Sequence, residues 1–180
     1  MKKKTLMSKK ISHFKQKAII SKDLGENRMN AIDKYSDLYN IEWIELYGMV
    51  LIEYLNRGKL VIRFIEKSAV YLCTKKVIKK DYSIGIAQIK ISTAKRFCSK
   101  KEDRKIAKRL LNDKFNISIS AQVIREYYLS PDNKNKILGL VKHYTTGNSN
   151  SKMNSTIFIY YKILKWVIKC ERFNQSREKI

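Results

Sequence analysis

The apolar residues of this chain recur at helical spacing over most of its length, and short polar or glycine-containing breaks separate the runs. Apolar positions that return every three or four residues are typical of helices. The alternation that is typical of a strand covers only a short stretch around Ile117 and Ile119. The pattern therefore predicts a mostly α-helical protein. Helices are expected over residues 41–56, 59–73, a short stretch from 92, 99–111, 120–129, 130–147 and 156–173.

Several helix boundaries carry a local signal. Ser92 is the expected N-cap of its short helix, and Ser99 with Glu102 has the spacing of a capping box. The sequence Ser130–Pro131–Asp132 places proline at the first helical position, where its missing N–H costs nothing. Between the helices we expect a lysine-rich loop over 74–83, a glycine turn over 83–89 and a polar loop over 147–155.

The first thirty residues differ from the rest of the chain. They are basic and only weakly periodic, which predicts a basic N-terminal arm, or a frayed first helix, over residues 1–30. Residues 31–180 hold the strong periodicity and are expected to form one helical domain. Of the 180 residues, 44% are hydrophobic, which is enough for one packed core.

The charge narrows the choice of partners. The chain has 39 Lys and Arg against 16 Asp and Glu, a formal net charge of +23. A surface with this surplus attracts polyanions, namely nucleic acid, anionic membranes or a cell wall that bears anionic polymers. Composition alone does not choose among these three.

No metal site and no cofactor is expected. The cysteines, Cys73, Cys98 and Cys170, are far apart, and neither His13 nor His143 lies close to one of them. This arrangement lacks the ligand spacing of a zinc site. We expect small buried thiols, and the alternative of one disulfide stays open.

The sequence also bears on localisation. No apolar run approaches the roughly 18 residues of a membrane span, so no transmembrane segment is expected. The N-terminus is positively charged, but Lys9, Lys10 and Lys15 interrupt the apolar core that a signal peptide needs. We therefore expect a chain that is made in the cytoplasm without a signal peptide.

One glutamate stands out in the first strong helix. That helix is apolar on both sides at about 100° per residue, which predicts a path through the interior. Glu53 lies on the same side as Leu46, Met49 and Val50. Desolvation raises the pKa of a carboxyl and favours the neutral form, which a general acid needs near neutral pH. The alternative interpretation is an ion pair with Arg57, one turn later.

Glu66, in the next helix, is the second candidate for a catalytic acid. Arg63 precedes it by three residues and Lys67 follows it directly. An Arg63–Glu66 pair on a half-exposed helix face accounts for this glutamate without chemistry. Glu42 and Glu45 fall near a helix start, where carboxylates interact favourably with the helix dipole, and are expected to be structural.

Four segments then occur in a recognisable order. An apolar helix ends in Glu (GMVLIE), a glycine turn carries Gln and Thr-Ala (SIGIAQIKISTA), Asn introduces a helix (NDKFNISISAQVIREYYL), and a further helix leads to Tyr and Gly (LGLVKHYTTGNS) before a tyrosine-rich last helix (FIYYKILKWV). Over residues 41–170 this order resembles the lysozyme-like lytic transglycosylase family, which cleaves peptidoglycan. The family pattern is Glu-Ser, then Gly-Leu-Met-Gln-Ile with Thr-Ala, then Asn-Ile, then Ala-Tyr-Asn-Ala-Gly.

The resemblance implies roles for individual residues. Glu53 matches the catalytic acid, and Tyr144 matches the tyrosine close to it. Gly85 and Gln88 match the turn that lines the glycan cleft, and Ser83 is expected to bind substrate beside them.

The chain departs from the family pattern after the catalytic acid. Tyr54 follows Glu53 where the family has Ser, and the gap from Glu53 to Gly85 is long. With a shorter gap, Glu66 becomes the acid instead. Glu53 remains the preferred assignment because its helix is apolar all round and carries no cation upstream, where helical side chains lean.

The implied fold is a lysozyme-like catalytic domain over 31–180 with a glycan cleft. The implied activity is cleavage of the bond between N-acetylmuramic acid and N-acetylglucosamine. One Glu protonates the glycosidic oxygen, and the transition state resembles an oxocarbenium ion. The carboxylate then takes a proton from the muramic 6-hydroxyl or from water, and both products stay open. Asp81, the nearest candidate for a second carboxylate, is interpreted as a loop residue.

The implied partners are peptidoglycan glycan strands, with anionic wall polymers bound by charge and no specific nucleic acid. The enzyme would act on the wall after release or by another export route. Two other functions stay open. A basic helical nucleic-acid-binding protein would explain the charge and the helix KKEDRKIAKRL. A catalytically inactive lysozyme-like interaction module would explain the altered residues that follow Glu53 and Tyr144.

Overall fold

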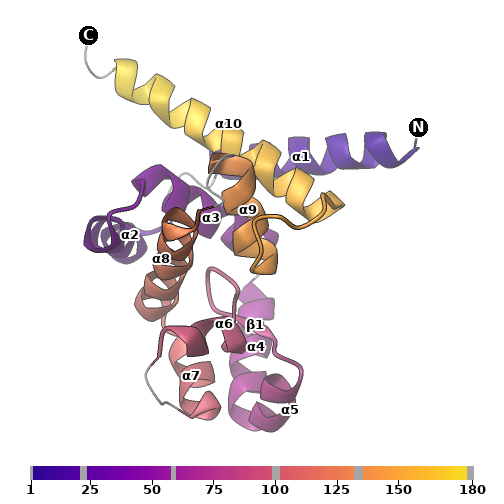
Figure 1. The fold of residues 1–180 in the computed structure, drawn as a ribbon. Helices are drawn as coiled ribbons and strands as arrows, with labels where there is room; N and C mark the ends of the chain where they lie inside the picture. The colour runs from indigo at the N-terminus through magenta and orange to yellow at the C-terminus, as the bar shows by residue number, and fades with distance from the viewer. Residues whose placement is uncertain (1, 21–23, 58–59, 99–101, 132–135, 178–180) are drawn as a thin grey trace.

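The computed structural model describes residues 2–20, 24–57, 60–98, 102–131 and 136–177, and in these the protein is mostly α-helical, as the periodicity predicts (Figure 1). A short antiparallel pair, β1 (Ser83–Ile84) and β2 (Ile89–Lys90), places Ile84 opposite Ile89. The helices are α1 (Lys2–Ile20), α2 (Glu26–Tyr39), α3 (Trp43–Asn56), α4 (Leu60–Leu72), α5 (Thr74–Lys79), α6 (Ile91–Arg96), α7 (Asp103–Leu110), α8 (Asp113–Leu129), α9 (Lys136–Thr146) and α10 (Ser155–Arg177).

Helix α3 is the centre of the fold. It contacts α1, α2, α8 and α10, and its residues from Glu45 to Ile52 are all buried, which agrees with the apolar pattern on both of its sides. Gly48 permits the close approach of α10, because a Cβ atom at this position would collide with the Leu164 side chain. Helices α4, α5 and α7 extend to the opposite end of the molecule from α10, and the strand pair and α6 lie between (Figure 1). The end of α3 therefore lies between α10 on one side and the group of α4, α5 and α7 on the other.

The expected loop over 74–83 is wrong in its first half, because residues 74–79 form α5. Thr74 and Val77 are buried on its inner side, and the Thr74 hydroxyl donates to the carbonyl oxygen of Val70 at 2.5 Å. Two buried positions in six residues are enough to hold one turn and a half against α4 and α7. The four lysines of this segment, which dominate the pattern, are exposed.

Helix α8 begins seven residues earlier than the apolar pattern predicts. The Asn112 side chain caps it by accepting a hydrogen bond from the N–H of Phe115 at 3.0 Å. Asn116, Ser118 and Ser120 interrupt the apolar pattern in its first turns, yet all three are buried. The helix therefore turns polar side chains toward the interior, which a hydrophobic pattern does not register.

Two predicted helix starts change in the structure, and a third falls outside the described residues. Lys90, and not Ser92, is the N-cap of α6, while Ser92 donates from its N–H and its hydroxyl to Asp81 at 2.9 and 2.6 Å. Ser99 of the predicted capping box lies outside the described residues, and α7 begins after Glu102. Asp132 also lies outside them, and α9 is described from Lys136.

The later boundaries agree better with the sequence. Helix α9 ends before Gly147, which takes φ 76°, a left-handed conformation that suits glycine. The polar loop over 147–155 and the last helix follow as predicted, although α10 continues to Arg177.

The first thirty residues contain more ordered structure than an arm. Residues 2–20 form α1, which packs against α3 and α10, and the Lys15 ammonium lies 5.6 Å from the centre of the Trp166 ring. Leu24 is buried in the core, and α2 begins at Glu26, before the predicted boundary at residue 31. Among the described residues, no helix is long and apolar enough to cross a membrane.

The three cysteines are free thiols. Cys73 is exposed, so the expectation of a buried thiol is wrong for this residue, because it stands between α4 and α5. Cys98 and Cys170 are partly buried.

Candidate functional site

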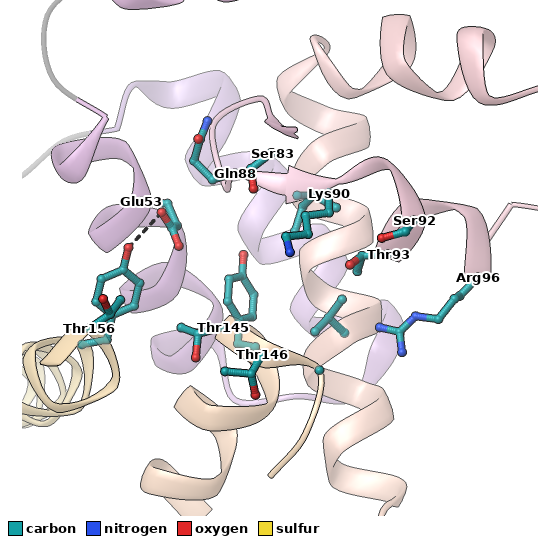
Figure 2. A pocket seen from close by; sticks show the side chains of 15 residues that line it. Glu53, Ser83, Gln88, Lys90, Ser92, Thr93, Arg96, Thr145, Thr146 and Thr156 are labelled. Carbon is teal, nitrogen blue, oxygen red and sulfur yellow. Dashed lines mark hydrogen bonds between the residues drawn. The ribbon is translucent and has the colours of Figure 1, made fainter. Parts of the chain in front are cut away.

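A cavity of about 520 Å³ lies where α3, the strand pair, α9 and α10 meet (Figure 2). Four residues proposed from the sequence, Glu53, Ser83, Gln88 and Tyr144, line it, whereas Gly85 and Glu66 are not among its lining residues. The rest of the lining is mostly hydroxyl-bearing or cationic: Ile89, Lys90, Ser92, Thr93, Arg96, Val123, Thr145, Thr146, Gly147, Thr156 and Tyr160. A polar lining with a few charged groups suits a hydroxyl-rich ligand.

Glu53 lies in the last turn of α3, and its carboxyl group faces the cavity (Figure 2). Desolvation by the surrounding protein raises the pKa of Glu53 from 4.5 to about 7, while a hydrogen bond from Tyr160 opposes that rise. The Tyr160 hydroxyl donates to Glu53 Oε2 at 3.1 Å, and the Asn56 amide donates to the Tyr160 oxygen at 3.1 Å. Glu53 can therefore hold a proton near neutral pH and release it there.

The alternative interpretation of Glu53, an ion pair with Arg57, is wrong. Arg57 binds the carboxylate of Glu66, and both side chains of that pair are largely buried. Glu53 accepts its hydrogen bond from a neutral hydroxyl, which stabilises a carboxylate less than a cation would. This is why desolvation dominates at Glu53.

Glu66 has a different environment from the one predicted. It does not pair with Arg63, whose guanidinium lies 4.4 Å from the centre of the Tyr54 ring. In addition to Arg57, Glu66 accepts hydrogen bonds from the N–H of Gly85 at 3.3 Å and from the amide of Gln88 at 3.2 Å. Its carboxylate thus fixes the glycine turn from behind the cavity.

The glycine turn depends on Gly85, which takes φ 82°. A Cβ atom there would collide with the Asn116 side chain and with the carbonyl oxygen of Leu110. Asn116 is fully buried, accepts from the N–H of Ala87 at 2.8 Å and donates to the carbonyl oxygen of Ile84 at 2.8 Å. Gly85 therefore shapes the wall of the cavity without lining it.

Gln88 lines the cavity, but its amide group is turned away from the centre of the cavity (Figure 2) and donates to Glu66. The amide also donates to the carbonyl oxygen of Gly85 at 2.9 Å, within a turn in which Gln88 takes φ 49°. Ser83, at the start of β1, lines the same wall. The Gln88 amide is bound to the turn, whereas the Ser83 hydroxyl makes no hydrogen bond to the turn within the described part of the chain.

Two contacts fix the side chain of Tyr144, a residue of α9. Its hydroxyl lies 2.7 Å from Ser120 Oγ and donates to the carbonyl oxygen of Ala87 at 3.1 Å. Burial and the nearby Glu53 carboxyl raise the pKa of Tyr144, so this phenol stays neutral. Tyr144 thus connects α8 and α9 to the glycine turn beside Glu53.

Sequence reasoning missed three residues of the site. Tyr160 is the direct partner of Glu53, and burial raises its pKa, so it remains a hydrogen-bond donor. Asn116 and Ser120 position the turn and Tyr144. The tyrosine-rich last helix was a signal for Tyr160, but periodicity does not show which tyrosine reaches the end of α3.

Asp81 does not line the cavity. Both of its carboxylate oxygens accept hydrogen bonds from Ser92, so this carboxylate holds the start of α6. Within the described part of the chain, Glu53 is the one acidic residue of the lining, and no group of His, Cys, Asp and Glu is suited to hold a metal ion. The chain matches no protein-family model, no curated protein and no solved structure.

Proposed function

We propose that this protein cleaves peptidoglycan glycan strands at the bond between N-acetylmuramic acid and N-acetylglucosamine, with Glu53 as both general acid and general base. The proposal rests on one observation above all. A carboxyl group with a pKa of about 7 faces a polar cavity and has a neutral tyrosine, not a cation, as its hydrogen-bond partner. The order of sequence motifs that resembles lytic transglycosylases supports the choice of substrate.

The first step uses the protonated form of Glu53. The carboxyl proton passes to the glycosidic oxygen, the bond from that oxygen to C1 of the muramic sugar breaks, and the N-acetylglucosamine leaves as an alcohol. Positive charge develops on the muramic ring as an oxocarbenium-like state. The hydrogen bond from Tyr160 stabilises the carboxylate that this transfer creates.

The second step returns the proton to Glu53. Its carboxylate removes a proton from the 6-hydroxyl of the same sugar, whose oxygen attacks C1 and closes an anhydro ring. If water is the nucleophile instead, the product is the hydrolysed sugar. The anhydro route needs no second carboxylate, which fits a lining whose one described acidic residue is Glu53.

The rest of the lining suits this substrate. Ser83 and Thr93 line, with their hydroxyl groups, a cavity in which sugar hydroxyls and N-acetyl groups need partners. Lys90 and Arg96 extend the lining with cations that match the carboxylates of peptide stems (Figure 2). Arg96 also binds Glu126 at 3.1 Å, so it is already oriented.

Purified protein tests the proposal directly. We expect it to clear a turbid suspension of peptidoglycan and to release muropeptides that mass spectrometry identifies, with the anhydro and hydrolysed products separated by their mass. Glu102→Gln, on an exposed surface pair with Lys105, is the matched control for Glu53→Gln. No release above a buffer control between pH 4.5 and 8, at several salt concentrations, would contradict the proposal.

A further inference from the structure

Helix α4 turns large apolar side chains toward solvent. Phe64 is 73% exposed, Ile65 59% and Leu72 83%. Ile65 and Leu72 are seven positions apart and so lie on the same side of the helix, and Phe64 is next to Ile65. Together with Tyr71, which is 51% exposed, we name these residues (Phe64, Ile65, Tyr71 and Leu72) the outer α4 face.

The orientation of α4 is fixed by polar contacts on its other side. Glu66 binds Arg57 and the N–H of Gly85, and Val70, one turn later, is fully buried. At about 100° per residue, these inner positions lie opposite Phe64 and Leu72. The helix cannot rotate to bury its apolar side without breaking a buried ion pair, so the apolar side stays outward.

Cations surround the outer α4 face. The Lys108 ammonium lies 5.3 Å from the centre of the Tyr71 ring, and Lys67, Lys75 and Lys76 are exposed on α4 and α5. Residues 59–110 contain 16 Lys and Arg against four Asp and Glu. A second copy of the chain would bring like charges together around this face, whereas an anionic surface would neutralise them.

We propose that the outer α4 face binds the surface of an anionic lipid membrane. The apolar side chains enter the boundary between headgroups and acyl chains, α4 lies in the membrane plane, and the surrounding lysines bind headgroup phosphates. This binding site lies at the end of the molecule opposite α10 (Figure 1) and does not depend on the proposed glycan cleavage.

Vesicle co-sedimentation tests this surface. The full chain should bind vesicles of phosphatidylglycerol mixed with phosphatidylcholine, bind phosphatidylcholine alone at least tenfold more weakly, and lose affinity as salt rises. The double variant Phe64→Ser, Leu72→Ser should bind the anionic vesicles at least about tenfold more weakly. It lacks the two large apolar side chains whose transfer from water into the membrane favours binding. The matched control is Leu38→Ser, Leu129→Ser, which changes residues that are 62% and 69% exposed on α2 and α8, and it should bind as the natural chain does.

Several results would overturn the proposal. Absence of binding to anionic vesicles would do so, and so would equal binding by the two double variants, because attraction would then come from net charge alone. Sedimentation velocity supplies the remaining outcome. A concentration-dependent dimer that Phe64→Ser, Leu72→Ser abolishes, without vesicle affinity in the natural chain, would show that a second copy covers this face.

Discussion

The guanidinium of Arg57 is bound to Glu66, the carboxylate of the following helix, and not to Glu53, which precedes it by one turn on α3. This pairing removes the nearest cation from Glu53 and leaves the Tyr160 hydroxyl as its hydrogen-bond donor. The two glutamates therefore have separate tasks. Glu66 pairs with Arg57 and holds the glycine turn, and Glu53 is a desolvated group whose pKa is raised to about 7.

Replacing Glu53 by Gln keeps the shape of the side chain and removes the transferable proton. If Glu53 is the general acid, the rate of muropeptide release should fall by about 10²–10⁴-fold, with circular dichroism unchanged. Glu102→Gln should retain the natural rate. A Glu53→Gln variant with full activity would place the acid elsewhere.

The same variant should change how stability depends on pH. The pKa of Glu53 is about 7 in the folded chain against 4.5 ordinarily, so the folded state binds this proton more tightly than the unfolded state does. The contribution to stability is complete below pH 4.5 and is lost as pH rises through 7. Through this group alone, the free energy of unfolding is about 3 kcal/mol lower above pH 7 than below pH 4.5.

Glu53→Gln lacks this titration. We therefore compare its free energy of unfolding with that of the natural chain by urea titration. The variant minus natural difference should increase as pH rises from 4.5 to 8 and should level off at either end of this range. A constant difference across this range would show that the pKa of Glu53 is not raised.

Tyr160→Phe removes the hydrogen bond that opposes the raised pKa of Glu53. The pKa of Glu53 should rise further, and the alkaline limb of the pH–rate profile should move to higher pH. Tyr161→Phe, at the adjacent and partly buried position, serves as the control and should leave that limb in place. A shift of the alkaline limb to lower pH in Tyr160→Phe would contradict the assigned hydrogen bond.

Glu66→Gln should act on stability more than on chemistry. It leaves the largely buried Arg57 without its carboxylate, which typically costs about 3–5 kcal/mol. Adding Arg57→Met should recover part of that loss, because the unpaired charge is then gone. Activity per folded molecule should stay within a few-fold of the natural chain. Loss of activity at matched folded fraction, together with an active Glu53→Gln variant, would make Glu66 the acid.

Two glycines with similar backbone conformations allow a controlled test of the turn. Gly85 has φ 82° and no room for a Cβ atom, whereas Gly147 has φ 76° and nothing within 4 Å of one. Gly147→Ala should cost about 1–2 kcal/mol for the left-handed conformation alone. Gly85→Ala should cost clearly more, because Asn116 and the Leu110 carbonyl must also move. Equal losses in thermal unfolding would exclude the steric part of this argument.

The sequence supports prediction of features that a single element determines. The apolar pattern on both sides of residues 41–56 predicts a buried helix, and the structure shows one with Glu53 near its end. Helix α5 was missed because its exposed lysines outnumber its two buried residues. The start of α8 was missed because Asn116 and Ser120 are polar and yet buried.

Contacts between elements that are distant in the sequence could not be predicted from the apolar pattern. Tyr160 reaches Glu53 only because α10 crosses the end of α3, over a sequence separation of 107 residues. Arg57 has Glu53 within its own helix, but the direction in which α4 leaves α3 brings Glu66 to it instead. Helical periodicity predicts which side of a helix faces inward, but not which other helix it meets.

The buried amide of Asn116 has a consequence for how the molecule opens. It binds the N–H of Ala87, the carbonyl oxygen of Ile84 and the carbonyl oxygen of Leu110, which belong to the glycine turn and to the end of α7. The Ala87 N–H can exchange its hydrogen with solvent only after α8 withdraws this side chain. Exchange at Ala87 should therefore follow the opening of α8, so that the turn and the helix behave as one cooperative unit.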